Sequence, residues 1–100
     1  MERRKSEEFT DVLLRYLRQS GLETPLNEHR VMALWPEVAG EVAGEVAARL
    51  SEASYIRNQT LHVRVRSAVL RQELVMQRTR LVLELNERVR AQVIADISFE

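Results

Sequence analysis

The stretch Thr60-Leu61-His62-Val63-Arg64-Val65-Arg66-Ser67 is the clearest strand signal in the chain. Large apolar residues at positions 61, 63 and 65 alternate with histidine and arginine at 62, 64 and 66. Successive side chains of a strand point to opposite faces of the sheet, so one face belongs to a core and the other to water or a partner. The stretch therefore predicts a sheet that is covered on one side.

Elements on both sides of this strand complete a small sheet. Residues 53–57 predict a short strand, and Asn58-Gln59 predicts the turn of a hairpin. Residues 68–90 predict one long helix, whose main buried ridge would consist of Leu70, Leu74, Leu81 and Leu85. A last strand is expected within residues 92–99, which again carry large apolar side chains.

The N-terminal half of the chain is predicted to be helical. Residues 6–20 form the first predicted helix, with Ser6 as its N-cap, Gly21 at its C-terminal cap, and residues 1–5 disordered. Its apolar residues follow helical spacing and predict one buried stripe, made of Phe9, Val12, Leu13, Tyr16 and Leu17.

Residues 25–50 are predicted to be helical in two parts. Pro36 removes a backbone donor, so we expect a break or kink at Trp35 and a second helix that runs to about Leu50. Gly40 and Gly44 lie one turn apart in that second helix, where each glycine costs about 1 kcal/mol relative to alanine. This cost suggests close packing there, or a partner lying on the backbone.

The order of elements predicts an α+β fold with helices packed on one face of a small three-stranded sheet. With 100 residues, the chain has room for a single domain over residues 1–100. Neither a targeting signal nor a long apolar run is visible, and there is no cysteine, so we expect a cytoplasmic protein.

Charge is balanced overall but polarised along the chain. Fifteen basic and fifteen acidic residues give zero net charge, yet residues 57–90 carry eight arginines against three glutamates. Arginine offers a planar fork that suits phosphate. The candidate nucleic-acid contacts are therefore Arg57, Arg64, Arg66, Arg71 and Arg78. The alternative is that these arginines only pair with neighbouring glutamates at the surface.

Residue types that carry catalysis are scarce. There is no cysteine, His29 and His62 lie in different elements, and no phosphate-binding loop of the Walker type is present. We therefore expect no enzyme, no catalytic residue, no metal site and no cofactor.

Five segments taken together resemble the DciA-like family of bacterial replicative-helicase operators, in particular its short Bacteroidetes-type members. The match covers about residues 9–99, and its segments are Trp35-Pro36-Glu37-Val38-Ala39-Gly40, Thr60–Val65, Ser67–Leu74, Leu85-Asn86-Glu87 and Val93–Phe99. The resemblance implies a KH-like fold and a non-enzymatic adaptor that binds the DnaB-type helicase and DNA to promote helicase loading.

Two sets of residues are candidates for the protein partner. One set is Trp35 with Gly40, although a lone tryptophan in a small domain is usually part of the core. The other is an extra apolar stripe that falls away from the main ridge of the 68–90 helix, formed by Val69, Met76 and Leu83. That stripe could instead be covered by the domain itself.

Two other functions remain open at this point. The chain could be a general module for single-stranded DNA or RNA, using the solvent face of the 60–67 strand, although that strand itself carries no aromatic residue for base stacking. It could also be a structural protein that associates with itself through the apolar stripe.

Overall fold

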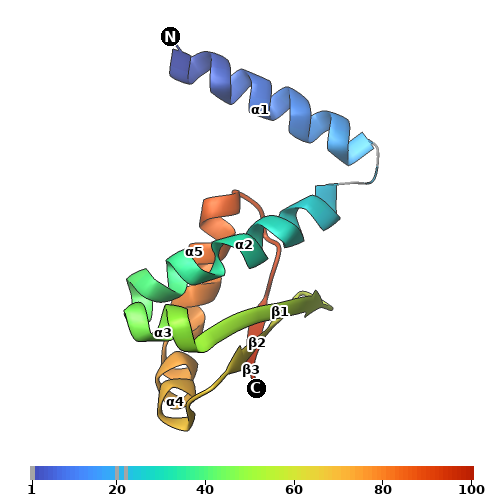
Figure 1. The fold of residues 1–100 in the computed structure, drawn as a ribbon. Helices are drawn as coiled ribbons and strands as arrows, with labels where there is room; N and C mark the ends of the chain where they lie inside the picture. Colours follow the sequence, from blue (N-terminus) through green and yellow to red (C-terminus); the bar gives the residue numbers. More distant parts are fainter. Residues whose placement is uncertain (1, 20, 22) are drawn as a thin grey trace.

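The computed structural model describes residues 2–19, 21 and 23–100, with side chains described for residues 8–16, 21 and 23–100. Three helices, two strands, two helices and a last strand follow one another along the chain (Figure 1). The elements are α1 (Glu2–Gln19), α2 (Glu23–Ala43), α3 (Glu45–Leu50), β1 (Ser51–Arg57), β2 (Thr60–Val65), α4 (Ala68–Met76), α5 (Arg78–Val89) and β3 (Asp96–Phe99). The predicted α+β class is confirmed.

The three strands form one sheet in the order β1-β2-β3. β1 and β2 are antiparallel and joined by a tight turn, in which Asn58 and Gln59 both adopt left-handed backbone conformations with φ of 51° and 59°. Two residues with positive φ match the right-handed twist of a hairpin, so the predicted turn is confirmed. β3 then pairs in parallel with β2, with Leu61 opposite Ile97.

Helices α2 and α5 pack on each other and on one face of the sheet (Figure 1). The side chains of β2 that face these two helices are buried: Leu61 and Val63 are 0% exposed and Val65 is 4% exposed. The predicted ridge of the C-terminal helical region also enters this core, since Leu74, Leu81 and Leu85 are fully buried. The other face of the sheet, which we call the outer sheet face, carries His62 and Arg64.

Of the break or kink expected at Trp35, the break does not occur, because α2 runs through Pro36 as one helix. Pro36 is exposed, so water can satisfy the carbonyl that its missing N–H leaves free. The chain breaks instead at Gly44, whose φ of 98° and ψ of 165° lie in a region that essentially only glycine adopts.

The single helix expected over 68–90 is also wrong, because it divides into α4 and α5 at Gln77. Gln77 has φ −98° and ψ 7°, which ends the regular helical geometry although no glycine or proline marks the position. The break lets α4 contact β2 while α5 packs on α2. Tertiary packing therefore overrides local helix propensity at this point.

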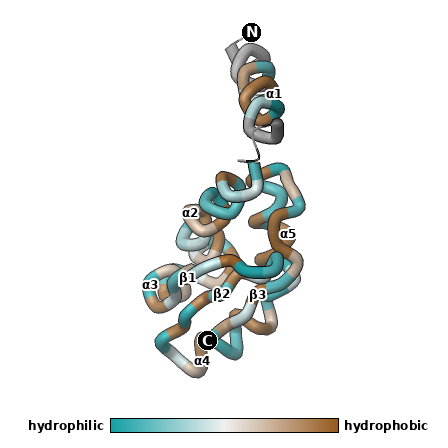
Figure 2. Tube along the Cα trace, turned by 90° about the vertical axis from the view of Figure 1, so that its right-hand side faces the viewer, coloured by the Kyte–Doolittle hydropathy of each residue, from teal (hydrophilic) through white to brown (hydrophobic). Residues whose placement is uncertain are grey.

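Helix α1 begins at Glu2, before the proposed N-cap Ser6. Two views show α1 projecting away from the sheet and from α5, and it contacts α2 (Figures 1 and 2). The expected burial of its apolar stripe is wrong, since Phe9 is 70% and Val12 62% exposed. Leu17 lies outside the side chains that the structure describes. No helix in the described part of the chain is long and apolar enough to cross a membrane.

The last strand, expected within residues 92–99, begins only at Asp96, because residues 91–95 form a loop that a buried asparagine holds in place. Asn86 of α5 donates from Nδ2 to the carbonyl of Ile94 at 2.8 Å. Its Oδ1 accepts from the backbone N–H groups of Val93 and Ile94 at 3.0 and 3.1 Å. This loop inserts the fully buried Ile94 into the core and delivers β3 to the edge of β2.

Candidate nucleic-acid interface

A β-bulge decides which residues of β1 reach the outer sheet face. The pairing between β1 and β2 shifts between Ala53 and Tyr55. Without this shift, simple alternation from the buried Ser51 would direct Tyr55 into the core. With it, Tyr55 lies opposite His62 on the outer sheet face, and Ile56 turns inward opposite Leu61.

The bulge brings two rings together on the outer sheet face. The rings of Tyr55 and His62 stack with centroids 4.2 Å apart and planes inclined by 10°. His62 Nδ1 lies 2.7 Å from Oε1 of Glu100, which fixes the orientation of the imidazole. Tyr55 remains 45% exposed. The outer sheet face therefore has an aromatic surface that the 60–67 strand alone did not reveal.

Arginines lie at both ends of this aromatic pair. Arg57 and Arg64 are exposed, and each lies two residues along its strand from Tyr55 or His62, which corresponds to about 7 Å. Arg64 and Arg66 also line a notch of about 220 Å³, together with Arg49 at the end of α3. Arg49 was not among the predicted contacts; it lies near Arg64 and Arg66 because α3 passes directly into β1 at Leu50 and Ser51.

These four arginines differ from other arginines of the domain in whether they form ion pairs. Among the residues that the structure describes, none of Arg49, Arg57, Arg64 and Arg66 forms an ion pair. Arg88, by contrast, forms ion pairs with Glu41, Glu37 and Glu84. Its hydrogen bond with Glu41 raises the pKa of the guanidinium above its ordinary value. The surface-pairing alternative therefore describes Arg88 and not the arginines of the outer sheet face.

The remaining two predicted phosphate contacts are engaged within the domain. Arg71 of α4 donates from Nη2 to the carbonyl of Val65 at 3.2 Å, so it holds α4 against the end of β2. Arg78, at the start of α5, pairs with Asp96 at 3.4 Å beside the edge strand β3. The structure thus brings Arg57, Arg64 and Arg66 together on one face and places Arg71 and Arg78 in intramolecular contacts.

The structure also places the two sets of candidate partner residues in different environments. Trp35 is fully buried and donates from Nε1 to the hydroxyl of Ser51 at 3.0 Å, so its side chain is not on the surface. Gly40 faces the Cβ of Ala48, where an added Cβ would lie 3.6 Å away, so it serves the close packing of α2 and α3. The apolar stripe is exposed, at 77% for Val69, 83% for Met76 and 63% for Leu83, but the break at Gln77 divides it between α4 and α5.

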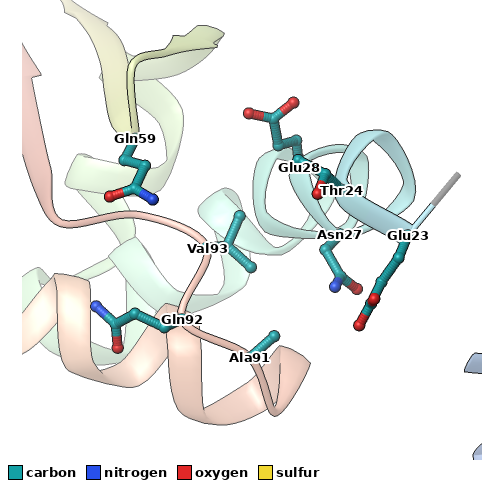
Figure 3. A pocket seen from close by; sticks show the side chains of 8 residues that line it. All are labelled: Glu23, Thr24, Asn27, Glu28, Gln59, Ala91, Gln92 and Val93. Carbon is teal, nitrogen blue, oxygen red and sulfur yellow. The ribbon is translucent and has the colours of Figure 1, made fainter. Parts of the chain in front are cut away.

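A second hollow of about 260 Å³ lies between the start of α2, the β1–β2 turn and the loop before β3 (Figure 3). Its side chains are carboxylates, amides and small groups, from Glu23, Thr24, Asn27, Glu28, Gln59, Ala91, Gln92 and Val93. Histidine, cysteine and lysine, which commonly act as nucleophile or base, do not line it. No group of three metal-ligating residues occurs in the described part of the chain.

The fold and the outer sheet face describe a small α+β module with an arginine-rich, partly aromatic surface. Comparison with family models matches residues 8–99 to the family described as Dna[CI] antecedent, DciA. The chain therefore belongs to the DciA family, as its sequence resemblance indicated. Comparison with curated proteins found no match. Membership supports a role in DNA replication that is connected with loading the replicative helicase.

Proposed function

We propose that this chain is a non-enzymatic adaptor that binds the DnaB-type replicative helicase and DNA, and so promotes loading of the helicase. The observation that carries the proposal is the family match over residues 8–99. The unpaired arginines of the outer sheet face supply a surface for phosphates, and an exposed apolar surface elsewhere supplies one for protein.

The helicase would dock on α4, through Val69 and Met76. These residues lie seven apart on one helix, which places them on the same side of it, and both are more than three-quarters exposed. Large apolar side chains exposed together are typical of protein-binding surfaces. Leu83 of α5 extends this surface only if the partner spans the break at Gln77.

Binding of the purified chain to the replicative helicase of the same organism tests the proposal. Met76→Asp should weaken helicase binding by about tenfold or more, because a buried charge opposes docking. Phe9→Asp is the matched control, since Phe9 is also exposed (70%) but lies on α1, at the opposite end of the molecule (Figure 1). Circular dichroism should show the same melting temperature for both variants and the unmodified chain.

The outcomes separate the function from the docking surface. Absence of helicase binding by the unmodified chain, at low and high salt, would refute the adaptor function. Binding that Phe9→Asp abolishes and Met76→Asp leaves intact would move the docking surface from α4 to α1 while the adaptor function stands. Loading activity, measured as DNA unwinding by the helicase on a protein-coated single strand, should fall in parallel with binding.

A further inference from the structure

The Tyr55–His62 pair has the geometry of a surface for stacking rather than of a core contact. Centroids 4.2 Å apart with planes inclined by 10° place the two rings nearly parallel, within the range of aromatic stacking. His62 is held from its other side by Glu100 at 2.7 Å, and its side chain is only 20% exposed. Tyr55, which is 45% exposed, therefore lies on a ring whose position is already fixed.

The pair lies on the face of the sheet that the core helices leave open. The helices that form the core lie on the opposite face of the sheet, where Leu61 and Val63 are buried (Figure 1). Tyr55 belongs to β1, which is an edge strand of the sheet. A flat ligand can therefore reach the tyrosine ring without displacing any helix.

The charges around the pair favour an anionic ligand. The acidic groups of this face are Glu52 opposite Arg64, Glu100 bound to His62, and Asp96 bound to Arg78. Of these carboxylates, Asp96 is paired with Arg78. The other two, Glu52 and Glu100, are outnumbered by the four arginines of the outer sheet face that form no ion pair, Arg49, Arg57, Arg64 and Arg66.

We propose that the Tyr55–His62 pair stacks an unpaired base of single-stranded DNA, whose phosphates lie on Arg57 and Arg64. Aromatic rings that hold bases beside a positively charged surface are how proteins bind single strands without reading their sequence. Bases of a duplex are stacked on one another and cannot reach a ring on a sheet surface, so this site selects single strands. The inference rests on the DNA-binding half of the proposed function and adds the site and its preference.

Fluorescence anisotropy with a labelled oligothymidylate of about 15 nucleotides measures the binding, and a duplex of the same length tests the preference. Tyr55→Ala should weaken single-strand binding by about 5- to 150-fold, as expected for losing one stacked base. Tyr55→Phe keeps the ring and should bind like the unmodified chain. Tyr16→Ala, which removes an exposed tyrosine from α1, is the matched control and should have no effect.

A salt series separates stacking from charge. Arg64→Ala should lower the slope of log affinity against log salt by about 1, because one phosphate contact is lost. Tyr55→Ala should leave that slope unchanged while lowering affinity at every salt concentration. Tyr55→Thr, which suits a strand, provides a second non-aromatic variant should the alanine variant be unstable.

Three results would overturn the inference: no single-strand binding by the unmodified chain, unchanged affinity in Tyr55→Ala, or equal losses for single-stranded and duplex DNA. Helicase binding is measured in the same preparations. Tyr55→Ala should leave it intact, because the proposed docking surface lies on α4. Absence of helicase binding by the unmodified chain would therefore refute the adaptor function alone, and unchanged single-strand affinity in Tyr55→Ala would refute the stacking site alone.

Discussion

Replacing Asn86 by alanine should destabilise the domain more than any other single change of a polar side chain that we consider. Asn86 is 8% exposed and makes three hydrogen bonds of 2.8–3.1 Å to the backbone of the loop before β3. The variant would remove all three bonds and leave the N–H of Ile94, a fully buried residue, without a partner. The N–H of Val93 would keep the carbonyl of Ala91, and the carbonyl of Ile94 would keep the side chain of Gln92.

The expected magnitude follows from the number of bonds. Each hydrogen bond contributes about 1 kcal/mol net, and a buried group that loses its partner can cost about 1–3 kcal/mol. Three bonds therefore give a loss of about 3 kcal/mol, against a total stability of about 5–15 kcal/mol for a domain. At about 4–8 °C per kcal/mol for a chain of this size, the melting temperature should fall by about 12–24 °C.

Urea unfolding followed by the fluorescence of the single, buried Trp35 measures the effect. Asn27→Leu is the matched control, because Asn27 is equally buried (5% exposed) but its Oδ1 has no hydrogen-bond partner among the described residues. Removing an unsatisfied polar atom should change the free energy of unfolding by less than about 1 kcal/mol. The reasoning fails if Asn86→Ala is within 1 kcal/mol of the unmodified chain, or if both variants lose the same amount.

Three further predictions concern the packing of the helices. Gly44→Ala should lower the free energy of unfolding by about 1–3 kcal/mol, because Gly44 has a positive φ. Gly40→Ala should leave it unchanged or raise it by up to about 1 kcal/mol, because the added Cβ has room. Chemical denaturation measures both variants, and the reverse order of stability would refute the prediction. Trp35→Phe removes a buried hydrogen bond and part of a fully buried side chain, so we expect a loss of about 2 kcal/mol by the same method, and a loss near zero would contradict the packing described. Arg88→Met should lower the melting temperature at low salt, because it removes three ion-pair contacts with glutamates. The decrease should be much smaller at 1 M salt, where the Debye length is about 3 Å. An equal decrease at both salt concentrations would exclude an electrostatic cause.

The fold class could be predicted because its signals are local and periodic. The alternation of β2 and the spacing of leucines 70, 74, 81 and 85 identify their buried faces directly, and the structure buries all of them. Asn58-Gln59 predicts its turn because few residues tolerate left-handed backbone. Each of these features depends on neighbours within a few residues.

The errors in the fold arise where distant packing decides the outcome. Pro36 was expected to break or kink a helix, and the break does not occur, because its side of α2 faces water. Gln77 was expected to continue a helix and does not, because α4 and α5 pack on different elements. The stripe of α1 has helical spacing, but spacing cannot indicate whether anything in the domain covers it.

Only part of the candidate site could be predicted, because only some of its residues follow from a local pattern. Arg64 and Arg66 follow from strand alternation, while Arg49 comes from another element and joins them only in the folded chain. Tyr55 was missed because one extra residue in β1 reverses the face to which it points. No sequence pattern around residues 53–55 marks that bulge. Its position becomes visible only when β1 is aligned against β2.

The parallel pairing of β3 with β2 has a consequence for how the domain forms. Synthesis proceeds from the N-terminus, so the hairpin and both following helices emerge before Asp96 to Phe99 can pair with β2. Until then, β2 presents an open edge of unpaired backbone groups beside a partly formed core. Contacts between segments far apart in sequence also close slowly. The nascent chain thus passes through an interval in which another extended strand could pair with β2 in the place of β3.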